Sequence, residues 1–299
     1  MFHTLRNQKI HGHATDLPVG TFKKEVHGLK CFIGNARKNM NHGQQWKELL
    51  TLPEPSAHIV QVYQDPEFLI DAVCRFVCAG LQQSDAIIVV ATKEHSDSFS
   101  ARLELDGFNL QNAVWQGRLR FLDVEPLLAG PIRNDMPDWA TFQRQTGEIF
   151  DQMPERCSSI RAYDEVSNVL WQGGQYEAAA RVEQFWNDLP TPKPLSVFCS
   201  YFADHLDSKV YGGQFQHICA HHTHLVSFPD HEKFTKAVGE ASEEILGPSM
   251  AGMLESLGPG FCPHIDMVPA QAALLYMNEH MPAAALKVMN RVREIVLDR

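Results

Sequence analysis

The sequence predicts an α/β fold in which a mostly parallel sheet is flanked by helices, followed by a helical C-terminal extension. Between residues 56 and 228, short apolar runs rich in β-branched residues alternate with segments of helical periodicity. This alternation is typical of a parallel sheet covered by helices. Residues 87–90 and 195–198 are almost wholly apolar, as expected of strands buried on both faces. Residues 229–299 have a helical pattern throughout.

The strands and helices of the middle region are expected to alternate along the chain. Each expected strand is a short apolar run: residues 58–63, 86–91, 118–123, 158–163 and 195–201. Each expected helix carries apolar residues at helical spacing: residues 66–81, 95–106, 139–153 and 176–189. In the tail, apolar residues between Ala285 and Val296 also recur at helical spacing. This stripe must pack either on the chain's own core or on a second copy, as a homodimer.

The chain divides into a basic N-terminal arm and linker (residues 1–55), an α/β domain (56–228) and a helical region (229–299). The first 50 residues hold eight Lys and Arg against three Asp and Glu, a charge of about +5, whereas the whole chain carries −10. The remainder is therefore near −15. An acidic body of this kind disfavours nonspecific binding of nucleic acid, which we do not expect as a partner.

The composition is that of an ordinary globular protein inside the cell. Of the 299 residues, 44% are hydrophobic and 21% are charged. No apolar run reaches the roughly 18–20 residues of a membrane span, and the first residues lack the pattern of a secretory signal. The seven cysteines form an odd set without a Cys-x-x-Cys pair, which favours a reduced compartment. We expect a cytoplasmic protein that contacts no membrane.

The first expected strand is not followed by a phosphate-binding loop. Such a loop needs glycines whose N–H groups cradle phosphate and a lysine that holds it. Here Asp65, Pro66 and Glu67 follow the strand, and they predict a helix N-cap, a first helical residue and an acidic first turn. Two carboxylates at this helix N-terminus would repel a triphosphate. We therefore expect neither nucleotide hydrolysis nor a cofactor.

Six blocks of residues 56–228 resemble, in order and spacing, the MEDS domain, a sensory module of methanogens, methylotrophs and a dichloromethane-responsive regulator. One block is residues 161–187, and the others are His58-Ile-Val-Gln-Val-Tyr63, Ala91-Thr-Lys-Glu-His95, Gly117-Arg-Leu-Arg-Phe-Leu-Asp123, Phe198-Cys-Ser-Tyr201 and His217-Ile-Cys-Ala-His-His222. The resemblance implies a core similar to RecA and KaiC that has lost its phosphate loop. It also implies a role in sensing small hydrocarbon derivatives and in signalling to a kinase, a DNA-binding domain or a partner protein.

The end of the fourth expected strand carries the polar residues that point most directly to a site. The family pattern Arg-x-Phe-Gly-Glu-Met reads here as Arg161-Ala-Tyr-Asp-Glu-Val, so that Asp164 stands at the glycine. Asp164 and Glu165 should point to opposite faces of the sheet, which makes them a poor acid–base pair. Arg161 and Glu165 are expected to form an ion pair that either contacts a ligand or stabilises the sheet. The ligand crevice is predicted at the carboxyl ends of the strands, lined by Tyr63, His95, Arg161, Glu165 and Tyr201.

Further candidate residues lie on or near helices. Glu183, Trp186 and Asn187 recur about one helical turn apart, and they either support the ligand site or form a seam that packs a helix on the sheet. His95 and His222 match histidines of the family. His222 is expected to contribute to the ligand site, and His95 either faces the crevice or is a buried, hydrogen-bonded histidine.

His217 and His221 are four residues apart, a spacing that places two imidazoles on one helical face where a metal could bridge them. A structural zinc site normally needs four protein ligands, and the run contains no carboxylate. The alternative is a helix end, where a protonated histidine favours the helix dipole. Cys199 lies in an apolar strand, where we expect a protonated, unreactive thiol.

These features indicate a non-catalytic sensory protein that binds a small molecule and signals through a separate kinase or regulator. Two alternatives stay open. One is a residual nucleotide-binding, ATPase-like protein that uses Lys93 and Arg161 in place of a phosphate loop. The other is an interaction scaffold whose pocket is vestigial.

Overall fold

The computed structural model describes residues 42–129, 132–133, 136–207, 210–211, 214–261, 265 and 267–297. Within these residues the middle region is α/β, as the sequence predicts. Its main sheet has six strands in the order β3-β2-β6-β7-β1-β8, and every neighbouring pair runs parallel. The strands are β1 (His58–Tyr63), β2 (Ala86–Ala91), β3 (Leu119–Asp123), β6 (Ile160–Asp164), β7 (Leu195–Phe202) and β8 (His224–Val226).

Five of these strands coincide with the predicted strands to within about two residues, and β8 is absent from the prediction. β8 has three residues, too few for a periodicity to appear. β1, β2, β6 and β7 are buried along nearly their whole length, which explains why apolar residues occupy both of their faces. A short antiparallel pair, β4 (Ile132–Arg133) and β5 (Met136–Pro137), stands apart from the main sheet.

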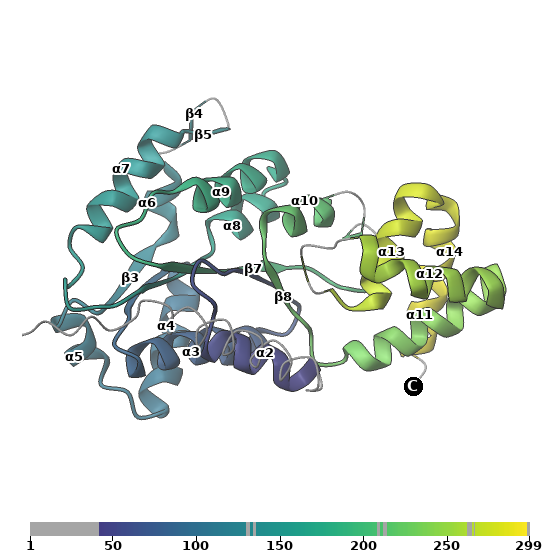
Figure 1. The fold of residues 1–299 in the computed structure, drawn as a ribbon, viewed down its shortest axis with the longest axis horizontal. Coiled ribbons are helices and arrows are strands. Elements are labelled where there is room, and N and C mark those ends of the chain that lie inside the picture. The colour runs from purple at the N-terminus through teal and green to yellow at the C-terminus, as the bar shows by residue number, and fades with distance from the viewer. Residues whose placement is uncertain are drawn as a thin grey trace, which may run out of the picture. The chain divides into compact units, whose positions relative to one another are not determined.

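Helices cover both faces of the sheet (Figure 1). One face carries α3 (Pro66–Gln82) and α4 (Lys93–Leu105), with α2 (His42–Thr51) packed on α3. The other face carries α7 (Trp139–Phe150), α8 (Val166–Gln172), α9 (Tyr176–Asp188) and α10 (Gln214–His221). Two short helices, α5 (Leu110–Trp115) and α6 (Val124–Ala129), precede and follow β3. Because side chains alternate along a strand, Arg161 and Tyr163 face α3 and α4, whereas Asp164 faces α9.

Helix α3 begins as the sequence predicts. The Asp65 side chain accepts a hydrogen bond from the Glu67 backbone amide at 3.0 Å, and Pro66 is the first helical residue. The cap and the acidic side chain of Glu67 occupy the helix N-terminus that a phosphate loop would offer to a nucleotide. At this position the structure therefore has a capped helix start in place of a phosphate loop, as the sequence predicts. The likeness to RecA and KaiC stays a prediction.

Helix α2 lies within the range that the sequence assigns to an arm and linker, and here the structure differs. Trp46, Leu49 and Leu50 of α2 are buried, and the helix packs on α3. The described part of the folded unit accordingly begins at His42. Residues 1–41, which form most of the predicted arm, lie outside the described residues.

In the described part of the tail, four helices follow the sheet: α11 (His231–Leu246), α12 (Pro248–Phe261), α13 (Pro269–His280) and α14 (Pro282–Leu297). The apolar stripe of α14 is buried within the chain at Ala285, Val288, Met289, Val292 and Ile295, and α14 packs on α11. The stripe therefore packs against other helices of the same chain. A homodimer through these helices stays a prediction. Among the described residues, no helix combines the length and apolarity that a membrane crossing requires.

Candidate functional site

At the carboxyl ends of the strands, two of the predicted crevice residues, His95 and Glu165, meet on the face covered by α4. The buried side chain of Glu165 follows β6, and its Oε2 accepts a hydrogen bond from the Thr92 backbone amide at 2.9 Å. Glu165 Oε1 lies 2.5 Å from His95 Nδ1 and accepts from the Tyr163 hydroxyl at 2.7 Å. Burial, followed by the charge of Glu165, raises the pKa of Tyr63 above its usual value. His95 and Glu165 are thus hydrogen-bonded to one another, and Tyr63 lies near enough to Glu165 for the carboxylate charge to affect its pKa.

The hydrogen bond to Glu165 raises the pKa of His95 above its usual value, against the opposing effect of burial. A histidine of this kind stabilises the fold fully below its unfolded pKa, and that stabilisation is lost as pH rises through the folded pKa. We expect the His95 ring to titrate, in NMR spectra, above the roughly 6.5 of an unperturbed histidine. Glu165→Gln should lower this midpoint. A His95 midpoint that does not change in Glu165→Gln would contradict the ion pair.

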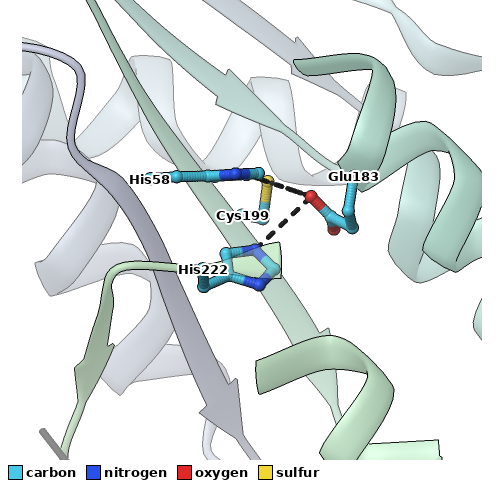
Figure 2. A group of neighbouring side chains, drawn as sticks. All are labelled: His58, Glu183, Cys199 and His222. Carbon is cyan, nitrogen blue, oxygen red and sulfur yellow. Dashed lines mark hydrogen bonds and ion pairs between the residues drawn. The ribbon is translucent and has the colours of Figure 1, made fainter. Parts of the chain in front are cut away.

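Tyr201, Glu183 and His222 belong to a second network, on the opposite face of the sheet. Glu183 on α9 is fully buried, and its Oε1 accepts a hydrogen bond from the Tyr201 hydroxyl. Glu183 Oε2 lies 3.1 Å from His58 Nε2, 3.4 Å from His222 Nε2 and 3.2 Å from Cys199 Sγ. Figure 2 shows these side chains converging on the carboxylate. Burial alone would raise the pKa of Glu183, but His222 and His58 hold it well below its usual value.

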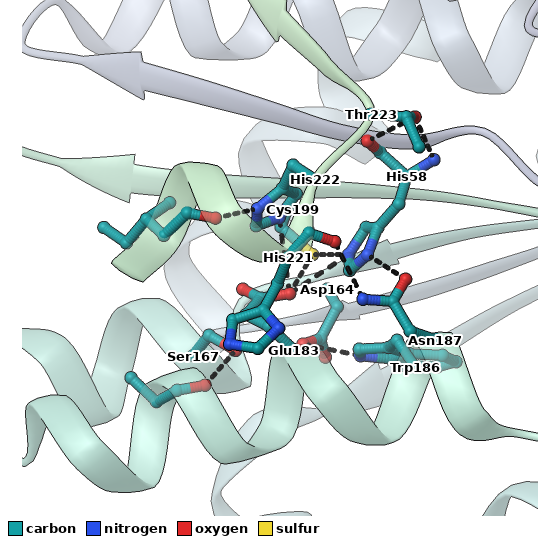
Figure 3. A network of polar contacts seen from close by, with 12 residues as sticks. His58, Asp164, Ser167, Glu183, Trp186, Asn187, Cys199, His221, His222 and Thr223 are labelled. Carbon is teal, nitrogen blue, oxygen red and sulfur yellow. Dashed lines mark hydrogen bonds and ion pairs between the residues drawn. The ribbon is translucent and has the colours of Figure 1, made fainter. Parts of the chain in front are cut away.

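Asn187 and Trp186 extend this network along α9 (Figure 3). The Asn187 amide oxygen lies 3.0 Å from His58 Nδ1, and its amide nitrogen donates to the His221 carbonyl at 2.8 Å. Trp186 donates from Nε1 to Asp164 Oδ2 at 3.2 Å. Glu183, Trp186 and Asn187 therefore pack α9 on the sheet through hydrogen bonds, which is one of the two interpretations that the sequence allows.

The structure does not test whether His217 and His221 share a metal. The side chain of His217 lies outside the described residues, and His221 enters the network through its backbone carbonyl. Among the described side chains, the metal-ligand types that gather are His58, Glu183, Cys199 and His222. Helical spacing does not detect this cluster because its members come from β1, α9, β7 and the turn after α10.

Arg161 lies at the amino end of β6, and the predicted ion pair with Glu165 is wrong. Glu165 comes four residues after Arg161 in an extended segment, which separates them by roughly 13 Å at the usual rise per residue. The two residues therefore lie at opposite ends of β6. Arg161 pairs with Asp85 at 2.8 Å, and Glu165 pairs with His95. The other guanidinium N–H groups donate to the carbonyls of Leu50, Thr51 and Phe76 and to the Gln83 side chain. Arg161 is therefore not part of the predicted crevice.

A cavity of about 40 Å³ lies between the sheet and helices α6, α7, α8 and α9. Its walls are mostly apolar and include Ile88, Val90, Phe142, Ile149, Leu170 and Val182. Asp164 also lines it, as a buried carboxyl whose Oδ1 has no hydrogen-bond partner. Burial, followed by the charge of Glu183, raises the pKa of Asp164 to about 8. At neutral pH Asp164 is therefore a neutral acid, which can donate a hydrogen bond.

The region that holds the two networks and the cavity matches a known family. The model of the MEDS family, described as the methanogen/methylotroph, DcmR sensory domain, matches residues 57–223, more than half of the chain. The chain belongs to the MEDS family. Because MEDS is a family of sensory domains, a sensory or signalling role is consistent with this membership. No curated protein matches the chain.

The MEDS region also contains His58, a site residue that no spacing pattern in the sequence indicates. His58 lies close to one end of the match and His222 close to the other, yet the structure brings their rings to 4.1 Å between centroids. One feature of the sequence could have pointed to His58: it starts a strand that is expected to be buried. A buried polar side chain without a partner costs free energy, so His58 should have a polar partner. The sequence predicts that Cys199 is an unreactive thiol in an apolar strand. Burial and then Glu183 do raise its pKa well above the usual value, but its neighbours are polar.

Proposed function

We propose that this chain is a non-catalytic sensory protein whose MEDS domain binds a small, neutral, largely apolar molecule beside Asp164. The observation that supports this best is the cavity, in which mostly apolar walls surround a buried carboxyl with an unpartnered oxygen. A buried polar group without a partner costs free energy. A ligand with one hydrogen-bond acceptor would bind the protonated carboxyl and remove that cost.

The cavity limits the ligand to a few heavy atoms. One water molecule needs roughly 10–15 Å³ of such space, so that a cavity of about 40 Å³ holds about three groups of that size. Small methylated or halogenated compounds fit this volume, whereas an aromatic ring would require the surrounding helices to move. The size agrees with the hydrocarbon derivatives that the MEDS resemblance implies.

The same helices that line the cavity offer a route for the signal. Phe142 and Ile149 line it from α7, and Val182 and Trp186 line it from α9. A ligand that binds one arrangement of these helices more tightly shifts the population toward that arrangement. We infer that a separate cytoplasmic kinase or regulator detects the difference, with no nucleic acid or membrane as a direct partner.

A thermal-shift screen of the full chain against small methylated, halogenated and aromatic compounds tests the proposed site. A ligand at 100 times its Kd adds about 2.7 kcal/mol to the free energy of unfolding, which raises the melting temperature by several degrees. Ile149→Phe fills the cavity and should abolish the shift. Ile70→Phe adds the same ring to α3, on the opposite face of the sheet, and should preserve it.

Two outcomes would contradict this site. A shift that survives Ile149→Phe unchanged would place the ligand elsewhere in the chain. The failure of every small compound to shift the melting temperature would favour the alternative of an interaction scaffold with a vestigial pocket.

The ATPase-like alternative depends on two cations that do not meet. Lys93 follows β2 and binds Asp97 on its own helix at 2.8 Å. Arg161 lies near the amino end of β6, level with Ile87 of β2. Lys93 thus lies beyond the carboxyl ends of the strands and Arg161 lies near their amino ends, too far apart for both to bind one triphosphate. We expect no heat of binding when ATP and magnesium are titrated into the chain, and a measured heat would restore this alternative.

A further inference from the structure

Four side chains of metal-ligand type converge on one buried point (Figure 2), and none of them lines the apolar cavity. Their donor atoms all lie within 4.8 Å of one another, and all four residues are buried. We propose that His58, Glu183, Cys199 and His222 form a binding site for a divalent transition metal of the zinc class. This site goes beyond the sensory function proposed above and does not depend on the ligand of the cavity.

Several distances between the donor atoms are close to those of a tetrahedral shell. With bonds of about 2.0–2.2 Å to nitrogen or oxygen and about 2.3 Å to sulfur, neighbouring donors around zinc lie roughly 3.3–3.7 Å apart. Here Glu183 Oε2 lies 3.1 Å from His58 Nε2 and 3.4 Å from His222 Nε2, and Cys199 Sγ lies 3.4 Å from His58 Nε2. Two imidazoles, a thiolate and a carboxylate are also ligands that zinc prefers.

Both imidazoles are held with Nε2 facing the cluster (Figure 3). His222 Nδ1 lies 2.6 Å from the Ile218 carbonyl, which can only accept a hydrogen bond. The Asn187 amide nitrogen donates to the His221 carbonyl, so the Asn187 oxygen is the atom that faces His58 Nδ1 at 3.0 Å. Each ring therefore carries a proton on Nδ1 and can present the lone pair of Nε2 to a metal. Outer hydrogen bonds of this kind orient the histidine ligands of metal sites.

The cluster also has more hydrogen-bond acceptors than donors. The two Nε2 atoms and Glu183 Oε2 face inward, while the Cys199 thiol offers one proton. The Tyr201 hydroxyl already donates to the other carboxylate oxygen of Glu183, and His222 Nε2 has no hydrogen-bond partner. A divalent cation would bind all four atoms once the thiol proton has left to solvent. The thiolate and the carboxylate then balance its two charges, which gives a neutral site in a buried position.

Four protein ligands leave no open coordination position, so the metal would be structural rather than catalytic. It would join β1 and β7 to α9 and to the turn before β8. Because α9 also lines the apolar cavity through Val182 and Trp186, the metal would fix one wall of that cavity. The rival interpretation is a metal-free cluster in which one imidazole takes up an extra proton and pairs with Glu183.

Titration with Co²⁺ of the full chain, after treatment with a chelator, distinguishes the two interpretations. We expect one equivalent of Co²⁺ per chain to produce the visible bands of tetrahedral cobalt and a thiolate-to-cobalt charge-transfer band, both of which Zn²⁺ then displaces. Cys199→Ser should lose the charge-transfer band. Cys74→Ala, which alters another buried cysteine on α3, should keep it. Asn187→Ala should weaken binding by about 10- to 100-fold, because it removes the partner of His58.

Two results would overturn the metal site. One is a wild-type chain that binds less than an equivalent of Co²⁺, and the other is a charge-transfer band that is equally strong in Cys199→Ser and Cys74→Ala. The second result would place the metal at another of the chain's cysteines. If circular dichroism shows that Cys199→Ser does not fold, Asn187→Ala serves as the test, and an unchanged affinity in that variant overturns the site.

Discussion

Replacing Arg161 by methionine should lower the free energy of unfolding by about 3–5 kcal/mol, because it leaves the Asp85 carboxylate buried without its cation. Both side chains are almost inaccessible to solvent. The guanidinium also uses all five of its N–H groups as donors. Two of the acceptors are the carbonyls of Leu50 and Thr51 in the last turn of α2, which have no partner within their own helix. Urea unfolding without any ligand measures the loss.

Arg144→Met is the matched control for this prediction. Arg144 forms an exposed ion pair with Glu148 at 3.0 Å on α7, and its removal should change the free energy of unfolding by less than about 1 kcal/mol. Helix α3 packs tightly over Arg161, since a Cβ on Gly80 would lie 2.7 Å from Arg161 Cδ. If Arg161→Met cost no more than Arg144→Met, Arg161 would not have the structural role that we assign to it.

Much of the fold can be predicted from the sequence because burial on both faces forces a strand to be apolar along its length. The run 87–90 illustrates this, since it falls inside β2, whose six residues are all buried. The start of α3 can be predicted for a different reason: Asp65 and Pro66 act locally, through one hydrogen bond and one fixed backbone angle. β8 could not be predicted because its three residues depend on pairing with β1.

The candidate site could be predicted only in part, because its contacts depend on how the strands align. Arg161 and Glu165 are close in sequence, yet the length of β6 separates them. The partner of Arg161 is Asp85, and the parallel register that sets Ala86 beside Ile160 brings the two together. Similarly, nothing in the local pattern indicates that His58 and His222 meet. The cavity beside Asp164 is lined from four helices and three strands at once, and the periodicity of a single segment cannot reveal such a space.

Asp164→Asn should make the protein more stable at alkaline pH and remove part of its pH dependence. The Asp164 carboxyl has a pKa of about 8 in the folded protein, against a usual value of 3.8. Between these values the folded state holds a proton that the unfolded chain has lost. The free energy of unfolding therefore falls as pH rises, by at most about 1.4 kcal/mol per pH unit. Asparagine has the shape of the protonated acid and does not titrate.

Urea unfolding of the wild type and Asp164→Asn at several values from about pH 5 to about pH 8 measures this effect. Other groups with a shifted pKa are present in both proteins. The raised pKa of His95 makes stability fall as pH rises, as Asp164 does, whereas the lowered pKa of His222 makes stability rise with pH. The difference between the two free energies therefore isolates Asp164. Asp188→Asn, at the exposed end of α9, corrects for the change in net charge. If the difference stays constant over this range, Asp164 is not a neutral acid in the fold, and the ligand proposed for the cavity loses its hydrogen-bond donor.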